Sequence, residues 1–270
     1  MSVAGARVLA IFAHPDDEAL LAGGLLAAVA AAGGSSMVLS LTRGEHGPRM
    51  LPGIDSAGDL AAVRERELRE ACGELGVARA ECWGYEDGSV AAADAREVAD
   101  RLAGLLARAR AEVLLTFSPE GLYGHADHRA VHRLVLAAAG RATGDDPPRA
   151  VYGATWPRGM VSEWAAAMSA RGLPTDLWGI PPEGFGADPA TIDWTVDVGA
   201  FAGAKLRAIA RHRSQTGAEH LLGALPADLG RRYLGHEWFV RLTPAGEVDP
   251  LARLAGDLGL PIRGSAAVGA

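Results

Sequence analysis

Short apolar segments alternate with longer segments of helical character through the first half of the chain. The apolar segments span residues 7–13, 36–42, 79–84 and 111–118, and candidate helices lie between them at 18–32, 59–75 and 92–110. An apolar run of this length suits a strand that is buried on both faces of a parallel sheet. Strands that alternate with helices predict an α/β fold: a Rossmann-like, doubly wound, mostly parallel sheet with helices on both faces.

The second half of the chain continues the pattern less regularly. We expect further strands at 150–156, 192–198 and 237–243 and helices at 161–171 and 200–213. Residues 156–195 are rich in Pro, Gly and Trp, which favours a lid or a substrate-facing insertion. The segment 246–270 is expected to be a loosely ordered tail, so that residues 1–270 form a single α/β domain.

Composition narrows the class of protein. The chain has 270 residues, about half of them apolar, and a formal net charge of −7. This charge, without a Lys/Arg cluster, argues against nucleic-acid binding. Cys72 and Cys82 form no CxxC pair, which fits a reducing compartment. Residues 19–34 are apolar but short and rich in Ala and Gly, so they predict a buried helix rather than a membrane span. No signal peptide is recognised at the start. We expect a cytoplasmic protein that binds no membrane, and the sequence makes no prediction of oligomeric state.

Two polar motifs follow predicted strands. "HPDDE" at 14–18 comes directly after the first strand, and "HADH" at 125–128 follows the fourth. In a doubly wound sheet the first and fourth strands are neighbours at the point where the strand order reverses, and ligands bind beyond their carboxyl ends. Two motifs more than a hundred residues apart are therefore expected to meet.

The residue types of these motifs suit a metal ion. Zinc binds imidazole nitrogen and carboxylate oxygen, and a catalytic zinc site uses three protein ligands with one position open. Pro15 restricts the backbone around it and lets His14 and Asp17 turn inward together, while Asp16 points elsewhere. One acid then coordinates the ion and the other faces water as a general base. Of the two histidines of the second motif, one completes the ligand set and the other faces the substrate.

Each motif alone also has a simpler interpretation. "HPDDE" is consistent with a turn whose acids stabilise a helix N-terminus, and "HADH" with a capped helix that carries surface imidazoles. The occurrence of both motifs at neighbouring strand ends favours the metal site. Iron(II) suits the same ligand types as zinc.

The two motifs resemble those of a known family. "AHPDDE" together with "YGHADH" is similar to the PIG-L/LmbE-like zinc-dependent de-N-acetylases, which include the GlcNAc-phosphatidylinositol deacetylase and the mycothiol and bacillithiol pathway deacetylases. The resemblance extends through "LTRGEHG", "VRERELREACGELG", "GYEDGS" and "KLRAIARHRSQ", so it covers about residues 7–215. Ala126 departs from the family, which often has proline there, but alanine supplies no ligand in either case.

The resemblance implies a role for each matching residue. Zinc would be held by His14, Asp17 and His128. Asp16 would be the general base, and His125 a general acid or oxyanion stabiliser.

The remaining implied roles concern orientation and substrate binding. Asp127 would orient His125, and Tyr123 would polarise the carbonyl. Arg64 and Asp87 match positions that contact the sugar conjugate, although Arg64 is equally consistent with a helix-surface charge. His212 and Gln215 either line the site or pack structurally, and Trp178 is a candidate for stacking on a sugar or for the core.

These observations predict a metal-dependent hydrolase. It would remove an N-acyl group, most simply N-acetyl, from a glucosamine-like sugar or its conjugate, with Zn²⁺ as cofactor and Fe²⁺ as the alternative. Its partner would be a small-molecule N-acetylated amino-sugar conjugate, bound by the loops at 43–58 and 156–195. The alternatives are an amidase acting on a larger thiol-sugar conjugate and a non-catalytic metal- or sugar-binding module. The presence of both Asp16 and His125 argues against a binding module, because binding alone needs no general base.

Overall fold

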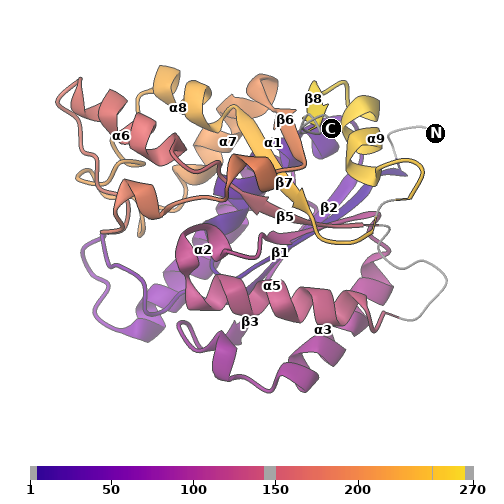
Figure 1. Ribbon diagram of the computed structural model, residues 1–270. Coiled ribbons are helices and arrows are strands. Elements are labelled where there is room, and N and C mark those ends of the chain that lie inside the picture. Colours follow the sequence, from indigo (N-terminus) through magenta and orange to yellow (C-terminus); the bar gives the residue numbers. More distant parts are fainter. Residues whose placement is uncertain (1–4, 143–149, 245, 265–270) are drawn as a thin grey trace.

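Eight strands form one sheet in the computed structural model, within residues 5–142, 150–244 and 246–264, which the structure describes. Their order across the sheet is β3-β2-β1-β4-β5-β7-β6-β8 (Figure 1). The strands are β1 (Arg7–Phe12), β2 (Ser35–Thr42), β3 (Arg79–Tyr85), β4 (Val113–Phe117), β5 (Ala150–Thr155), β6 (Trp194–Asp197), β7 (His236–Arg241) and β8 (Ile262–Gly264). The first five are parallel, whereas β7 is antiparallel to β5 and β6, and β8 is antiparallel to β6.

Helices cover both faces of this sheet, which confirms the doubly wound prediction. The helices are α1 (Asp17–Ala31), α2 (Ala57–Leu75), α3 (Ala95–Ala109), α4 (Gly121–Gly124), α5 (Ala126–Ala139), α6 (Met160–Ser169), α7 (Ala202–Ile209), α8 (Ala227–Leu234) and α9 (Pro250–Asp257). Helices α3 and α5 pack together, and α1 packs with α2 and α7. In Figure 1, α3 and α5 lie below the sheet and α1 and α7 above it.

The core is built from the segments that are apolar in the sequence. All five residues of β4 are buried, as is β1 from Val8 onward, which is the pattern of strands covered on both faces. Helix α1 is buried along almost its whole length, as predicted. Gly24 is needed there because a Cβ atom would lie 2.4 Å from the side chain of Val198. In the part of the chain that the structure describes, no helix is long and apolar enough to cross a membrane.

Residues 246–264 differ from the expectation of a loosely ordered tail over 246–270, and residues 265–270 lie outside the described part of the chain. Residues Pro250–Asp257 form α9, which buries Leu251, Leu254 and Ala255. Strand β8 then pairs with β6 and extends the sheet. Helix α8 is also absent from the sequence-based prediction. These elements are short, so their periodicity is weak, and tertiary contacts stabilise them: α8 packs against α6 and α7, and β8 pairs with β6.

The order of the strands brings the two motifs together. β1 pairs with β2 on one side and with β4 on the other, with Val8 opposite Val113 and Ala10 opposite Leu115. The chain moves outward from β1 to β3 and then returns to place β4 against β1. The carboxyl ends of β1 and β4 therefore meet at the switch point, where a doubly wound sheet binds its ligands.

Candidate active site

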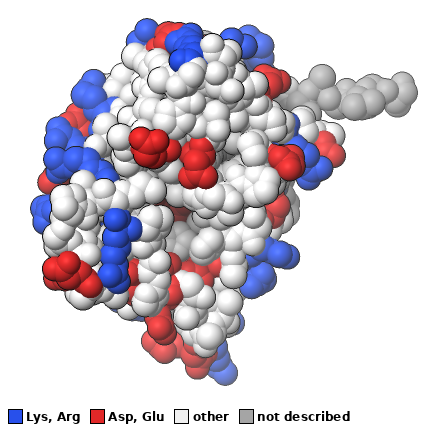
Figure 2. Space-filling model, turned by 90° about the vertical axis from the view of Figure 1, so that its left-hand side faces the viewer, with Lys and Arg blue, Asp and Glu red and all other residues white. Residues whose placement is uncertain are grey.

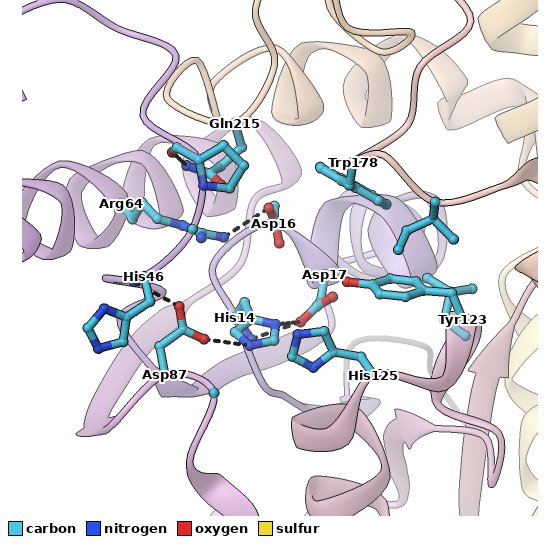
Figure 3. Close-up of a pocket in the computed structure, with 15 residues that line it drawn as sticks. His14, Asp16, Asp17, His46, Arg64, Asp87, Tyr123, His125, Trp178 and Gln215 are labelled. Atoms are coloured by element: carbon cyan, nitrogen blue, oxygen red, sulfur yellow. Dashed lines mark hydrogen bonds and ion pairs between the residues drawn. The ribbon is translucent and has the colours of Figure 1, made fainter.

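The turn between β1 and α1 sends its two aspartates in different directions. Asp16 has φ +136° and ψ −27°, a conformation that a residue with a side chain rarely adopts. Its backbone N–H donates to Oε2 of Glu18 at 3.0 Å, whereas the backbone N–H of His14 donates to Oδ2 of Asp17 at 2.8 Å. The Asp16 carboxylate thereby reaches Arg64, and that of Asp17 faces His14 (Figure 3). The Asp17 carboxylate also lies 3.5 Å from Nε2 of His128.

The loop after β4 orients the ring of His128. Its Nδ1 lies 3.2 Å from the carbonyl oxygen of Gly121, which can only accept a hydrogen bond, so Nδ1 carries a proton. Burial lowers the pKa of His128 to about 3, and the neutral ring then has a bare Nε2. The ring of Phe117 stacks on it with a centroid separation of 3.9 Å. His128 thus presents a free lone pair toward the turn after β1.

The two motifs meet as the sequence predicts. Nδ1 of His14 lies 3.1 Å from Nε2 of His128. The Asp17 carboxylate lies beside both, with Oδ2 at 3.6 Å from His14 Nδ1 and Oδ1 at 3.5 Å from His128 Nε2. All three side chains are buried. Ligands at about 2.0–2.1 Å around a tetrahedral ion are separated by roughly 3.3 Å, so these three residues fit a metal ion.

Two carboxylates, of Asp87 and Asp127, lie at the Nε2 side of the His14 ring and favour a positive charge there. Nε2 of His14 lies 3.0 Å from Oδ1 of Asp87 and 3.4 Å from Oδ2 of Asp127, although neither contact has the angle of a good hydrogen bond. Burial opposes a charge on His14, but Asp127, Asp17 and Asp87 together raise its pKa well above the ordinary value. Burial likewise opposes a charge on Asp17, but His128 and His14 hold its pKa at about 2. A proton or a metal cation at His14 balances these carboxylates.

Other combinations of donors also lie close together among the described residues. The donor atoms of His14, His125 and His128 are all within 4.8 Å of one another, as are those of His14, Asp87 and Asp127. In the second group the carboxylates face the side of His14 away from His128. Carboxylates in that position commonly orient a histidine ligand of a metal.

Asp16 is paired with a buried arginine. Arg64 of α2 is 3% exposed and donates to the carbonyls of Gly44 and Pro15 and, at 2.9 Å, to Oδ2 of Asp16. This burial excludes the interpretation of Arg64 as a surface charge. Burial raises the pKa of Asp16 to about 6, although the Arg64 guanidinium opposes this shift. Gly44 and Gly47 leave room for Arg64 in this position, because a Cβ atom at either would lie 2.4 Å from its guanidinium group.

His125 is held in one tautomer by the start of α5. It is the N-cap residue, and its Nδ1 accepts the backbone N–H of Asp127 at 3.2 Å. Burial and the charge on His14 lower the pKa of His125. The neutral ring therefore carries its proton on Nε2, and the residue lines the cavity. A neutral His125 is suited to donate a hydrogen bond rather than to act as an acid.

The carboxylate of Asp127 lies elsewhere than the sequence suggests. It accepts the backbone N–H groups of Gly88 and Val90 at 2.7 and 3.1 Å and faces His14, whereas only its backbone contacts His125. Asp87, in the same loop, accepts the backbone N–H of His46. Asp127 therefore joins the loop of Asp87 to the ring of His14.

Tyr123 stands beside the two histidines of the second motif. Its ring centroid lies 5.6 Å from that of His125 and 5.3 Å from that of His128. Burial raises the pKa of Tyr123, so its hydroxyl stays protonated. That hydroxyl has no hydrogen-bond partner among the residues that the structure describes, and it is available as a donor.

A cavity of about 350 Å³ opens above these groups. Figure 2 shows a hollow in this face of the molecule, with acidic side chains around and within it. The cavity is lined by residues of both predicted motifs, together with His46, Gly47, Pro48, Arg64, Asp87, Gly88, Leu122, Trp178, Ile180 and Gln215. The loops at 43–58 and 156–195 thus both contribute to the wall.

Some lining residues escape sequence reasoning. Pro48 and Ile180 carry no motif beyond their place in the two loops, and His46 lies in "LTRGEHG" but receives no role from the family resemblance. His212, a candidate for lining the site, is instead fully buried behind it, where its Nε2 contacts Oε1 of Glu18 at 2.9 Å.

Comparison with known proteins agrees with the family resemblance of the two motifs. A family model described as PIG-L: GlcNAc-PI de-N-acetylase matches residues 9–139. A protein of Thermobispora bispora named 1D-myo-inositol 2-acetamido-2-deoxy-alpha-D-glucopyranoside deacetylase is 31% identical over 290 residues, with 96% of each chain covered. A protein of Saccharopolyspora erythraea with the same name, numbered 1, is 36% identical over 238 residues and 77% of each chain.

The fold is also found in solved structures. The crystal structure of a conserved protein from Thermus thermophilus is similar with a TM-score of 0.61 and 27% sequence identity. The match covers 89% of this chain and 96% of that one. The similarity therefore includes most of the sheet and the helices that position the site.

Proposed function

Because this chain belongs to the PIG-L family of GlcNAc-PI de-N-acetylases, we propose that it hydrolyses the N-acetyl group of a glucosamine-containing conjugate with the aid of a divalent metal. Its relatives are named for an inositol glucosaminide, and we propose a substrate of that class, an N-acetylglucosamine joined to a small polar aglycone. One observation carries the proposal: His14, Asp17 and His128 converge beside Asp16 and His125 at the base of an open cavity.

In this proposal His14, Asp17 and His128 hold the metal. The two ring nitrogens lie 3.1 Å apart, and each lies within 3.6 Å of one oxygen of the Asp17 carboxylate, Oδ2 for His14 and Oδ1 for His128. The neutral His128 offers a bare nitrogen. A bound divalent metal would polarise the acyl carbonyl and lower the pKa of a water molecule. Zinc is the first candidate, and iron(II) suits the same donors. Asp127 and Asp87 hold the ring of His14 from its other side.

Asp16 moves the proton. Its carboxylate, held at 2.9 Å by Arg64, takes a proton from the attacking water and later gives it to the departing amine. The C–N bond then breaks to yield acetate and a free amino sugar. Its pKa of about 6 suits a group that both accepts and releases a proton near neutral pH. Arg64 thus acts through Asp16, and it also lines the cavity, where we propose the substrate contact that the family resemblance implies.

His125 and Tyr123 stabilise the charge that develops on the acyl oxygen. The Nε2–H of neutral His125 and the unpartnered hydroxyl of Tyr123 are both donors at the cavity. Donors of this kind, already oriented before the reaction, typically contribute about 10²–10³ in rate. Asp87, 8% exposed at the cavity wall, is proposed to accept from a sugar hydroxyl.

The proposal is tested by acetate release from N-acetylglucosaminyl inositol, with zinc-loaded and iron(II)-loaded protein. We expect Asp16→Asn to retain the metal and to lose about 10²–10⁴ in kcat. The matched control is Asp257→Asn, an exposed aspartate at the end of α9. Equal turnover by wild type and Asp16→Asn would refute the role of Asp16. Metal and sugar binding without acetate release would identify a binding module instead.

A further inference from the structure

Trp178 adopts a backbone conformation that is costly for a bulky residue. Its φ is +56°, in the left-handed region that favours glycine. Large side chains persist there only when the surroundings hold them, and such residues cluster at binding sites. The conformation at Trp178 therefore calls for a physical reason.

Hydrogen bonds hold the turn that carries Trp178. The backbone N–H of Trp178 donates to Nε2 of His220 at 3.3 Å. Asp176 accepts twice, from Gly179 N–H at its side chain (3.1 Å) and from Leu221 N–H at its carbonyl (2.8 Å). The turn is thus tied to His220 and Leu221, which fixes the backbone from which the indole projects.

The indole forms a wall of the catalytic cavity. Figure 3 shows it across the cavity from His46 and Asp87, with Asp16 and Asp17 between them. The rings of Tyr123, which also lines the cavity, and Phe185 lie beside the indole, with centroid separations of 5.9 and 6.2 Å. Trp178 is only partly buried, and its Nε1 has no hydrogen-bond partner in the described part of the chain.

We propose that Trp178 is the platform on which the pyranose ring of the substrate rests, an inference that depends on the proposed deacetylation. One face of a pyranose carries C–H groups and its edge carries hydroxyls. The rigid indole covers the C–H face, while its Nε1–H and the polar groups of Asp87 and Gln215 face the edge. Trp178 thereby selects a cyclic sugar over an open-chain amide that carries the same acetyl group.

The test compares a cyclic with an acyclic substrate. Kinetics are measured on N-acetylglucosaminyl inositol and on N-acetylethanolamine, which has the amide but no ring. We expect Trp178→Ala to raise KM for the glucosaminide about tenfold, equivalent to about 1.4 kcal/mol, with kcat within about twofold. KM for the acyclic amide should not change, and Trp178→Phe should recover most of the loss. Trp83→Ala, a partly buried tryptophan outside the cavity lining, is the matched control.

A glycine variant separates recognition from folding. Trp178→Gly removes the ring but suits the positive φ, so it should be more heat-stable than Trp178→Ala while its KM is raised as much. Equal changes of KM for both substrates, or a loss confined to kcat, would overturn the platform.

The affinity for N-acetylglucosamine, measured by calorimetry, separates the proposed platform at Trp178 from the proposed deacetylation. Weaker binding by Trp178→Ala than by wild type supports the platform even if no substrate is deacetylated. Unchanged binding overturns it while the hydrolase proposal stands.

Discussion

The position of Asp127 predicts that its carboxylate controls the affinity of the site for metal, by supporting His14. It does not predict a role in orienting His125. Its carboxylate accepts two backbone N–H groups and lies 3.4 Å from Nε2 of His14. In Asp127→Asn an amide N–H₂ replaces one carboxylate oxygen, and this group faces either a backbone N–H or the imidazole of His14. The substitution also removes a negative charge beside His14. The ring of His14 then loses a partner that orients it.

The size of the effect follows from the general behaviour of such partners. Loss of a group that supports a metal ligand typically weakens binding about 10- to 100-fold. With free zinc at about 100 times the wild-type Kd, zinc stabilises the wild type by about 2.7 kcal/mol. At the same zinc concentration the variant should gain only about 0.4–1.4 kcal/mol, from RT ln(1 + [L]/Kd).

The assay is chemical unfolding with and without zinc, together with competition against a chelator of known affinity. Asp94→Asn is the matched control, because Asp94 also accepts two backbone N–H groups with its carboxylate but caps α3. It should lose some stability and retain the full zinc effect. A zinc Kd within twofold of wild type in Asp127→Asn would contradict the reasoning.

Three further substitutions test the site from other directions. Arg64→Met should destabilise the protein by about 1–3 kcal/mol in urea unfolding, because it leaves the partly buried Asp16 carboxylate and the carbonyls of Gly44 and Pro15 without their donor. The double variant with Asp16→Asn should be less destabilised. His125→Ala should lower kcat by about 10²–10³, because a donor to the acyl oxygen is lost. It should also lower the free energy of unfolding by about 0.5–2 kcal/mol, because α5 loses its N-cap, and it should leave the metal content unchanged. His212→Leu should lower kcat by roughly tenfold or more without loss of metal. The reason is that Glu18, which accepts the backbone N–H of Asp16, loses its contact with His212. His212→Gln should restore part of the lost kcat. Retained kcat in His212→Leu would assign that histidine to packing alone.

The central sheet and the meeting of the two motifs could be predicted because both depend on local patterns. The strands β1, β2, β4 and β5 are mostly apolar runs, and helices α1 to α3 fill the intervals between β1 and β4. Once a doubly wound order is assumed, His14 and His128 must lie near each other, and the 3.1 Å between their ring nitrogens agrees. Family resemblance then supplied candidate roles for residues within the motifs.

Contacts between distant segments could not be predicted in the same way. Nothing in "YEDG" or "HADH" indicates that Asp127 would accept the N–H groups of Gly88 and Val90. Arg64 lies on a helix of mixed polarity, and only the approach of the glycines at 44 and 47 buries it against Asp16. Short elements such as α9 and β8 depend on tertiary contacts: α9 buries Leu251, Leu254 and Ala255, and β8 pairs with β6.

The sequence alone therefore determined which residue types gather at the ends of β1 and β4, because strand order follows from the alternation of apolar runs and helices. Only the tertiary structure decided the task of each side chain: Asp127 behind His14, Arg64 on Asp16 and Trp178 across the cavity. The physical reason is that hydrogen bonding, burial and charge pairing depend on atoms a few ångströms apart, and those atoms come from segments far apart in the chain.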